Sequence, residues 1–243
     1  MRPNSESQFM KQLIIFNQYK TCVEIGVANG STTIQLCAAT QKTGGHVYGF
    51  DCWAQHGLKK QFKPQDTKTN VENRIQQAGY KNYTLHKIDT TTNEFKTLLI
   101  KECPKIDFAF IDGCHSYIGL KNDFDQVYPL LSKTGTIAFH DTLRIDGCRE
   151  FILDLRTKYF DGTYDIVDFP WGFGKRRAGI SLLIKRSYPI VKLYIDEICG
   201  SLSTPQEIIT REKKWFDDQI QIKSQKLEIS IDDMLLNKIG KIR

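Results

Sequence analysis

A short apolar run that turns through a glycine into a helix constrains the fold of this chain more than any other feature. The run, residues 23–25, contains Glu24 and leads into Gly26, and a helix opened by hydroxyl side chains follows from Ser31. A second apolar run ends in Asp51, 27 residues after Glu24. Tight turns at strand ends bring the backbone close to a ligand, and a carboxylate that ends the next strand can bind a ribose. The segment therefore predicts a nucleoside-cofactor site.

The glycine spacing of this turn argues against a dinucleotide. Dinucleotide-binding turns follow G-x-G-x-x-G, in which the second glycine lets the backbone reach a pyrophosphate. Ala28 stands where that second glycine is expected, and the last interval, to Gly30, is shortened. A cofactor that contains adenosine but no phosphate fits this turn better. The alternative is an ordinary strand, turn and helix in which Ser31 is only the helix cap.

The pattern Glu-x-Gly-x-x-x-Gly at residues 24–30 resembles motif I of class I S-adenosylmethionine-dependent methyltransferases. The resemblance covers about residues 20–186 and implies S-adenosylmethionine as the cofactor, with Asp51 in the place of the ribose-binding acidic residue. The expected cofactor contacts are Glu24, Gly26, Ala28, Gly30, Ser31, Asp51, Trp53, Asp89 and Thr90. Two of them have an alternative role, since Trp53 also fits a core position and Asp89 also fits the cap of the next helix.

Strands and helices alternate along the chain after residue 20. Apolar runs predict strands at residues 21–26, 46–51, 83–89, 106–112 and 135–141. Helical spacing predicts helices at residues 31–40, 67–79, 93–101, 118–131 and 148–159. Two more strands are predicted at residues 164–169 and 179–185, paired antiparallel. This order is typical of a doubly wound, mostly parallel α/β sheet with a terminal antiparallel hairpin, and class I methyltransferases have this seven-stranded, Rossmann-like arrangement.

The two ends of the chain are predicted to be helical. Residues 1–19 contain an N-terminal helix, at 5–19, that either covers the ligand site or contacts a second subunit. Residues 20–187 are the predicted S-adenosylmethionine-binding domain, and residues 188–243 are a helical extension. The terminal helices are therefore candidates for a homo-oligomer contact.

Composition limits the class of protein. Of the 243 residues, 40% are hydrophobic and 26% are charged, as in ordinary soluble globular proteins. The net charge of +6 is spread along the chain, which allows an anionic acceptor but gives no support for nucleic acid as a partner. The seven cysteines form no C-x-x-C pair, and neither a signal peptide nor an 18-residue apolar run occurs. We expect a cytoplasmic protein without a membrane span.

Acidic residues end five successive predicted parallel strands, namely Glu24, Asp51, Asp89, Asp112 and Asp141. Ligands of an open α/β sheet bind beyond these strand ends, so the five side chains are expected along one rim. Asp112 and Asp141 end neighbouring strands, and two carboxylates suit a hard divalent cation such as Mg²⁺. His115, on the turn after Asp112, is placed to take a proton from an acceptor hydroxyl.

Asp112-x-x-His115, followed 28 residues after Asp112 by His140-Asp141, resembles a pattern of metal-dependent sugar O-methyltransferases that act on macrolide deoxysugars. It is also similar to the pattern of catechol-type O-methyltransferases. The resemblance implies Asp112, His140 and Asp141 as metal ligands, and His115 and Asp112 as catalytic residues. His140 replaces an acidic residue of the sugar enzymes, which shifts the expected metal from Mg²⁺ toward Mn²⁺, Fe²⁺ or Zn²⁺. Catechol-type enzymes have an amide where this chain has Thr142.

The expected function is therefore S-adenosylmethionine-dependent, metal-assisted O-methylation of a sugar, glycan or related polyol. Residues 59–65 and 171–177 are the candidates for binding this small-molecule or glycan acceptor. Three alternatives are open at this stage. His115 could cap the following helix and His140 could pack against a helix layer; the enzyme could use His115 as base without a metal; or the protein could bind a nucleotide without transferring a methyl group.

Overall fold

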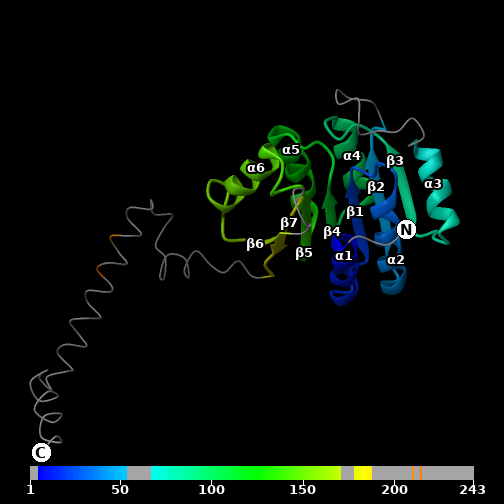
Figure 1. Cartoon of the computed structure of the whole chain (residues 1–243), viewed down its shortest axis with the longest axis horizontal. Helices are drawn as coiled ribbons and strands as arrows, with labels where there is room; N and C mark the ends of the chain where they lie inside the picture. Colours follow the sequence, from blue (N-terminus) through cyan, green and yellow to red (C-terminus); the bar gives the residue numbers. More distant parts are fainter. Residues whose placement is uncertain (1–4, 54–66, 171–177, 188–209, 211–213, 215–243) are drawn as a thin grey trace, which may run out of the picture. The chain divides into compact units, whose positions relative to one another are not determined.

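The computed structural model describes residues 5–53, 67–170, 178–187, 210 and 214 (Figure 1). The chain divides into two compact units, Met1–Pro189 and Ile190–Arg243. In the second unit only Thr210 and Lys214 are described, and both are helical. The predicted extension at 188–243 otherwise lies outside the described residues, as do both ranges predicted to bind the acceptor, 59–65 and 171–177.

Seven strands form one sheet in the first unit. They are β1 (Thr21–Ile25), β2 (His46–Asp51), β3 (Tyr83–Lys87), β4 (Ile106–Ile111), β5 (Leu131–His140), β6 (Tyr164–Phe169) and β7 (Ile180–Lys185). Their order is β3-β2-β1-β4-β5-β7-β6, in which β1 to β5 pair in parallel and β7 is antiparallel to both β5 and β6. The predicted fold class is confirmed. The strand order reverses between β1 and β4, where ligands of such sheets bind.

Helices cover both faces of this sheet (Figure 1). One face packs against α1 (Ser5–Phe16), α2 (Ser31–Thr43) and α3 (Lys68–Gln77). The other packs against α4 (Asn93–Glu102), α5 (Tyr117–Val127) and α6 (Asp146–Arg156). The sequence of β4 explains why two cores form. Phe108 and Phe110 belong to the first core, whereas Ala109 and Ile111 belong to the second, because successive strand residues point to opposite faces.

Several predicted boundaries are wrong for local reasons. The helix expected at 118–131 ends at Val127, because Pro129 cannot donate to an α-helix and Tyr128–Leu130 forms a 3₁₀ turn instead. The following strand then begins at Leu131, four residues before the predicted start. The strand expected at 83–89 ends at Lys87, so Asp89 lies beyond it rather than at its last position.

The N-terminal helix α1 is an integral part of the first helix layer. Met10 and Ile14 are buried in the core that α1 shares with α2, and the ring of Phe9 lies 4.7 Å from that of Phe169 in β6. The helix ends at Phe16 instead of residue 19. A lid function or a contact with a second subunit stays a prediction.

Candidate active site at the carboxyl ends of the parallel strands

The turn after β1 uses its own amide groups in internal hydrogen bonds. Four of these amides donate to acceptors within the turn or in β2, namely those of Gly26, Ala28, Gly30 and Ser31. A phosphate-binding turn keeps such donors free for the anion. Because they are already used here, the turn suits a ligand that presents no phosphate to it. This supports the argument from glycine spacing against a dinucleotide.

Gly26 is required for a contact between two strand ends as well as for the turn itself. Its φ of 90° lies in the left-handed region, and a Cβ at this position would be 2.2 Å from the carbonyl oxygen of Asp112. The end of β1 can therefore approach the end of β4 only if residue 26 has no side chain. The interpretation of Ser31 as a helix cap is wrong, since Gly30 is the N-cap of α2 and no side chain caps it.

Glu24 is fully buried beside α2. Its Oε2 accepts a hydrogen bond of 2.5 Å from the Thr33 hydroxyl, whereas its Oε1 is buried with no partner among the described residues. Burial raises the pKa of this carboxyl well above its ordinary value, and Asp112 and Asp51 raise it further. An oxygen in this state is stabilised by a donor or a positive charge that a ligand brings. Glu24 therefore fits the amino-acid end of the expected cofactor.

Asp51 joins the turn after β1 to the turn after β2. Its Oδ2 accepts from the Ala28 amide at 2.8 Å and its Oδ1 accepts from the Trp53 amide at 2.6 Å. The Trp53 indole in turn donates to the Ala28 carbonyl at 3.0 Å. Burial raises the pKa of Asp51 although these hydrogen bonds oppose the shift. Each carboxylate oxygen can accept a second hydrogen bond, so a ribose contact remains compatible with this arrangement.

Asp89 and Thr90 lie on the turn between β3 and α4. Asp89 Oδ1 accepts from the amide and the hydroxyl of Thr91, at 2.9 Å and 2.7 Å. The alternative role of Asp89 as a helix cap is wrong, because Thr92 caps α4 by accepting from Phe95. The Thr90 carbonyl accepts from two side-chain amides of α5, so this turn is fixed against that helix.

Asp123 of α5 lies next to Thr90 and was missed by the sequence analysis. It is 1% exposed, and its Oδ2 has no partner among the described residues. Burial raises its pKa from 3.8 to about 6, although hydrogen bonds with Thr90 and Asn122 act in the opposite direction. Its place on the buried face of α5, between Leu120 and Phe124, is the sequence signal that could have identified it.

We expect Asp123→Asn to change the pH dependence of stability. Because the folded-state pKa is raised, the contribution of protonated Asp123 to the free energy of unfolding is fully present below pH 3.8. This contribution is lost as the pH rises through about 6. The free energy of unfolding of the variant, relative to the wild type, should therefore increase by up to about 3 kcal/mol between pH 4 and pH 8. Urea unfolding at several pH values measures this difference. Asp125→Asn, at an exposed position of the same helix, is the control and should follow the wild type.

The second half of the site is a cluster of two carboxylates and two imidazoles. One ligand atom from each of Asp112, His115, His140 and Asp141 lies within 4.8 Å of the others. Asp112 Oδ1 lies 3.0 Å from His115 Nε2 and 2.9 Å from His140 Nδ1. Asp141 Oδ2 lies 3.7 Å and 3.8 Å from the same two nitrogens. The structure thus brings together all four residues to which sequence analysis gave chemistry.

The strand ends explain how these side chains meet. Asp112 follows β4, and its amide donates to the Ile25 carbonyl at 2.8 Å, which fixes it beside β1. His140 is the last residue of β5 and alternates with Ala138, so it lies on the face covered by α1. Asp141 has a φ of 57°, and this left-handed residue turns the chain so that its carboxylate reaches the same point. His140 therefore lies on the helix-covered face of β5, as the alternative interpretation expected, while its Nδ1 also faces the cluster.

His115 lies on the turn from β4 into α5. The cap of this helix is Ser116, whose hydroxyl accepts from the Gly119 amide at 3.0 Å. The alternative in which His115 caps the helix is therefore wrong. The imidazole instead points at Asp112 and Asp141.

Charge is balanced inside the cluster. Burial raises the pKa of Asp112, but hydrogen bonds from His115 and His140 outweigh it, and the net pKa is lowered. Burial lowers the pKa of His140, but hydrogen bonds to Asp112 and Glu6 raise it to about 10. In the protein without a cation, His140 is therefore protonated and neutralises a neighbouring carboxylate. A bound cation would replace this proton.

The donor set fits a divalent transition metal. Carboxylate oxygens and imidazole nitrogens together suit Mn²⁺, Fe²⁺ or Zn²⁺ better than Mg²⁺, which prefers oxygen alone. Asp141 Oδ1 is buried without a partner among the described residues, and Asp141 is only 7% exposed. Thr142, which stands where catechol-type enzymes have an amide, is 1% exposed, and its hydroxyl accepts from Ser181 at 2.9 Å.

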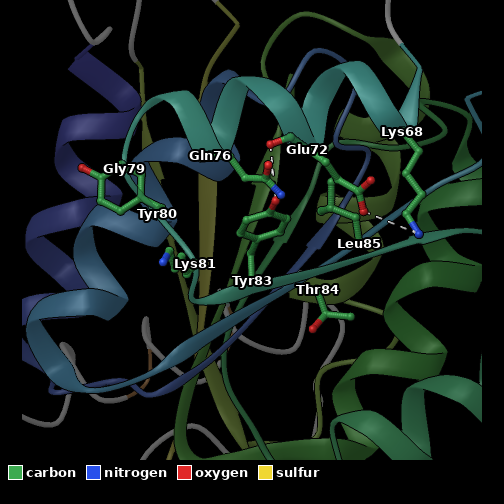
Figure 2. Close-up of a pocket in the computed structure, with 9 residues that line it drawn as sticks. All are labelled: Lys68, Glu72, Gln76, Gly79, Tyr80, Lys81, Tyr83, Thr84 and Leu85. Atoms are coloured by element: carbon green, nitrogen blue, oxygen red, sulfur yellow. Dashed lines mark hydrogen bonds and ion pairs between the residues drawn. The ribbon is translucent and has the colours of Figure 1, made fainter.

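A separate pocket of about 570 Å³ lies between α3 and the edge strand β3 (Figure 2). Glu72 contributes to one wall, where it pairs with Lys68 at 3.6 Å and its carbonyl accepts from the Tyr83 hydroxyl at 3.3 Å. None of the site residues predicted from the sequence lines this pocket. The candidate active site at the strand ends is therefore distinct from this pocket.

One family model matches the central part of this chain. Residues 23–142 match the model of a family described as a methyltransferase domain. The match covers 120 of the 243 residues. The domain includes the turn after β1 and ends one residue after the cluster, and the protein is therefore an enzyme that transfers methyl groups. The comparison with curated proteins gives no match.

Solved structures, two of them of O-methyltransferases, share the fold of this chain. The O-methyltransferase from Bacillus cereus in complex with SAH is 16% identical and has a TM-score of 0.60, over 75% of this chain and 81% of that one. TomG from Streptomyces achromogenes, an O-methyltransferase of tomaymycin synthesis in complex with SAM, is 15% identical with a TM-score of 0.58, over 74% and 79%. Cofactor-bound Rv0187 from MTB is 16% identical with a TM-score of 0.60, over 75% and 80%. At these identities the likeness concerns the fold.

No helix in the described part of the chain combines the length and the apolar character that a bilayer crossing requires.

Proposed function

We propose that this methyltransferase domain transfers a methyl group from S-adenosylmethionine to a hydroxyl of a sugar, glycan or related polyol, assisted by a divalent metal ion. The observation that carries the proposal is the cluster of Asp112, His115, His140 and Asp141 at the same sheet edge as the turn after β1. A nucleoside-binding turn and a proton-accepting, cation-binding cluster are the two parts that such a reaction needs.

The turn after β1 supports S-adenosylmethionine as the methyl donor. Its amides are used internally, which disfavours a phosphate, and the buried Glu24 Oε1 suits the positively charged amino group of a methionine. The solved neighbours include proteins in complex with SAM and SAH. S-adenosylmethionine supplies a sulfonium methyl that is already activated, so the protein contributes mainly by positioning the two reactants.

We assign the metal to Asp112, His140 and Asp141, and the proton transfer to His115. Three protein ligands leave coordination positions open, as in catalytic metal sites. A divalent cation supplies Lewis acidity that makes an acceptor hydroxyl more acidic. His115 then takes the proton of this hydroxyl, and Asp112 orients the imidazole through the 3.0 Å contact. This assignment leaves His115 out of the metal ligands. An imidazole nitrogen has one lone pair, and a nitrogen that coordinates a cation cannot also accept a proton.

Calorimetric titration with S-adenosylhomocysteine tests the cofactor assignment. We expect saturable binding at one site, and weaker binding by Glu24→Gln, because an amide cannot take up the negative charge that a cationic amino group would stabilise on the buried carboxyl. Titration with NADH is the control and should give no heat of binding. Lack of binding of S-adenosylhomocysteine by folded protein would overturn the proposal.

A metal-independent small-molecule methyltransferase is the second candidate. The observation in its favour is the contact between His115 and Asp112, since a carboxylate that orients an imidazole is sufficient for general-base catalysis. Turnover that survives EDTA but is lost in His115→Ala would favour this candidate. Turnover that is lost in EDTA and restored by Mn²⁺ would favour the metal-assisted reaction.

Two further properties stay proposals. The described cysteines are free thiols, in agreement with the reducing cytoplasm that the sequence predicts. Assembly into a homo-oligomer through the terminal helices is open to direct measurement by analytical ultracentrifugation.

A further inference from the structure

Glu6, on the N-terminal helix α1, contacts His140 of the proposed metal cluster. It precedes residues 23–142, which match the methyltransferase family model. Its Oε2 lies 3.4 Å from His140 Nε2, and the two residues are 134 positions apart in the sequence. The side chain of Glu6 is 14% exposed and that of His140 is 20% exposed. The contact is therefore largely shielded from water, where a carboxylate and an imidazole interact more strongly than on an open surface.

The ring of His140 lies between two carboxylates. Its Nδ1 lies 2.9 Å from Asp112 Oδ1, on the side of the cluster, and its Nε2 faces Glu6 on the other side. The Phe110 ring meets it edge-on, with centroids 5.8 Å apart. The orientation of the imidazole is thus set from three directions.

This arrangement determines which nitrogen can bind a cation. A carboxylate only accepts hydrogen bonds, so Glu6 keeps a proton on Nε2. Asp112 is likewise an acceptor for Nδ1–H, at 2.9 Å, so the choice applies when a cation occupies the Asp112 oxygen: a neutral imidazole would then keep its one N–H on Nε2 and present the lone pair of Nδ1 to the cation. Carboxylates that hold a metal-binding histidine in this way raise its basicity and fix its tautomer.

Helix α1 is anchored well enough for Glu6 to do this. Met10 and Ile14, one and two turns further along the helix, are buried in the core shared with α2. Phe9 packs against Phe169 of β6. A helix held at these points presents Glu6 to His140 without a large loss of conformational entropy on binding.

We propose that Glu6 is a positioning residue of the metal site, which selects the Nε2–H tautomer of His140 so that Nδ1 binds the cation. This inference rests on the metal assignment proposed above and extends the site to a residue of α1. Helix α1 is then a structural part of the metal site.

Binding of Mn²⁺, followed by electron paramagnetic resonance and calorimetry, tests the role of Glu6. We expect Glu6→Ala to weaken Mn²⁺ binding by about 10- to 100-fold. Glu6→Gln should lose less, because its amide oxygen still accepts from Nε2–H. Glu94→Gln is the matched control, since Glu94 also lies in the first turn of a helix but faces solvent. It should bind Mn²⁺ as the wild type does.

A second measurement separates positioning from a loss of folding. In the Zn²⁺-loaded wild type, the ¹⁵N resonances of the His140 imidazole should report a proton on Nε2 and none on Nδ1, and the proton on Nε2 should be lost or exchange faster in Glu6→Ala. Two results would overturn the role of Glu6 but leave the metal assignment intact. One is wild-type protein that binds Mn²⁺ no better than Glu6→Ala, and the other is a His140 protonated on Nδ1 in the Zn²⁺-loaded protein. Wild-type protein without any affinity for divalent metals would overturn the metal assignment as well, whereas binding of S-adenosylhomocysteine would still support the rest of the proposed function.

Discussion

Gly26→Ala is expected to destabilise the fold strongly, although it adds only one methyl group. Alanine at a φ of 90° costs about 1 to 2 kcal/mol because Cβ approaches the following carbonyl. The new Cβ would also lie 2.2 Å from the backbone carbonyl oxygen of Asp112, which cannot move without displacing the end of β4. Overpacking of this kind costs about 1 to 3 kcal/mol. We therefore expect a total loss of about 2 to 5 kcal/mol in the free energy of unfolding, measured by urea denaturation.

Gly79→Ala is a matched control for this effect. Gly79 has a φ of 88°, yet a Cβ there meets nothing within 4 Å. It should therefore show only the backbone cost of about 1 to 2 kcal/mol. The difference between the two variants measures how tightly the ends of β1 and β4 are packed. Equal losses in both would contradict the contact between Gly26 and Asp112.

Asp112→Asn is expected to give the largest loss of methyl transfer. Asp112 Oδ1 contacts both His115 and His140, so one substitution removes a proposed metal ligand and the partner that orients the proposed base. Loss of a positioned acid–base group alone costs about 100-fold or more. We expect turnover to fall by at least about 100-fold and Mn²⁺ affinity by at least about 10-fold. S-adenosylhomocysteine should still bind, because the turn after β1 does not use the Asp112 side chain.

The control for Asp112→Asn is Asp146→Asn. Asp146 lies in the first turn of α6 and its side chain is exposed, so this variant removes a nearby charge without touching the cluster. It should keep the turnover of the wild type. A value for Asp112→Asn within about twofold of the wild type, in protein that binds S-adenosylhomocysteine, would exclude a catalytic role for the cluster.

The local sequence pattern was sufficient to predict most of the fold. The strand at His46–Asp51 was predicted with its observed bounds, and the order of strands and helices indicated the parallel sheet with its antiparallel hairpin. Boundaries failed where a single residue changes the local conformation. Pro129 replaces the last turn of α5 with a 3₁₀ turn, and Gly30 in the left-handed region becomes the cap in place of Ser31.

The site was predicted in outline, and its finer contacts were not. Asp112 and Asp141 could be assigned to neighbouring strand ends from the sequence, because parallel strands end at the same edge of the sheet. The role of His140 was open, since the sequence does not reveal which helix covers its face of β5. Asp123 was missed because a carboxylate on the buried face of a helix is an exception to the hydrophobic pattern used to find that face.

The sequence by itself determined the order of the elements and the acidic residues that end the parallel strands, because hydrophobic periodicity and turn residues act over a few neighbouring positions. Only the tertiary structure decided that Gly26 meets Asp112 and that Glu6 meets His140. These contacts join segments that are far apart in the chain, and they depend on how the strand ends and α1 pack together. That packing is a property of the whole core and cannot be read from any one segment.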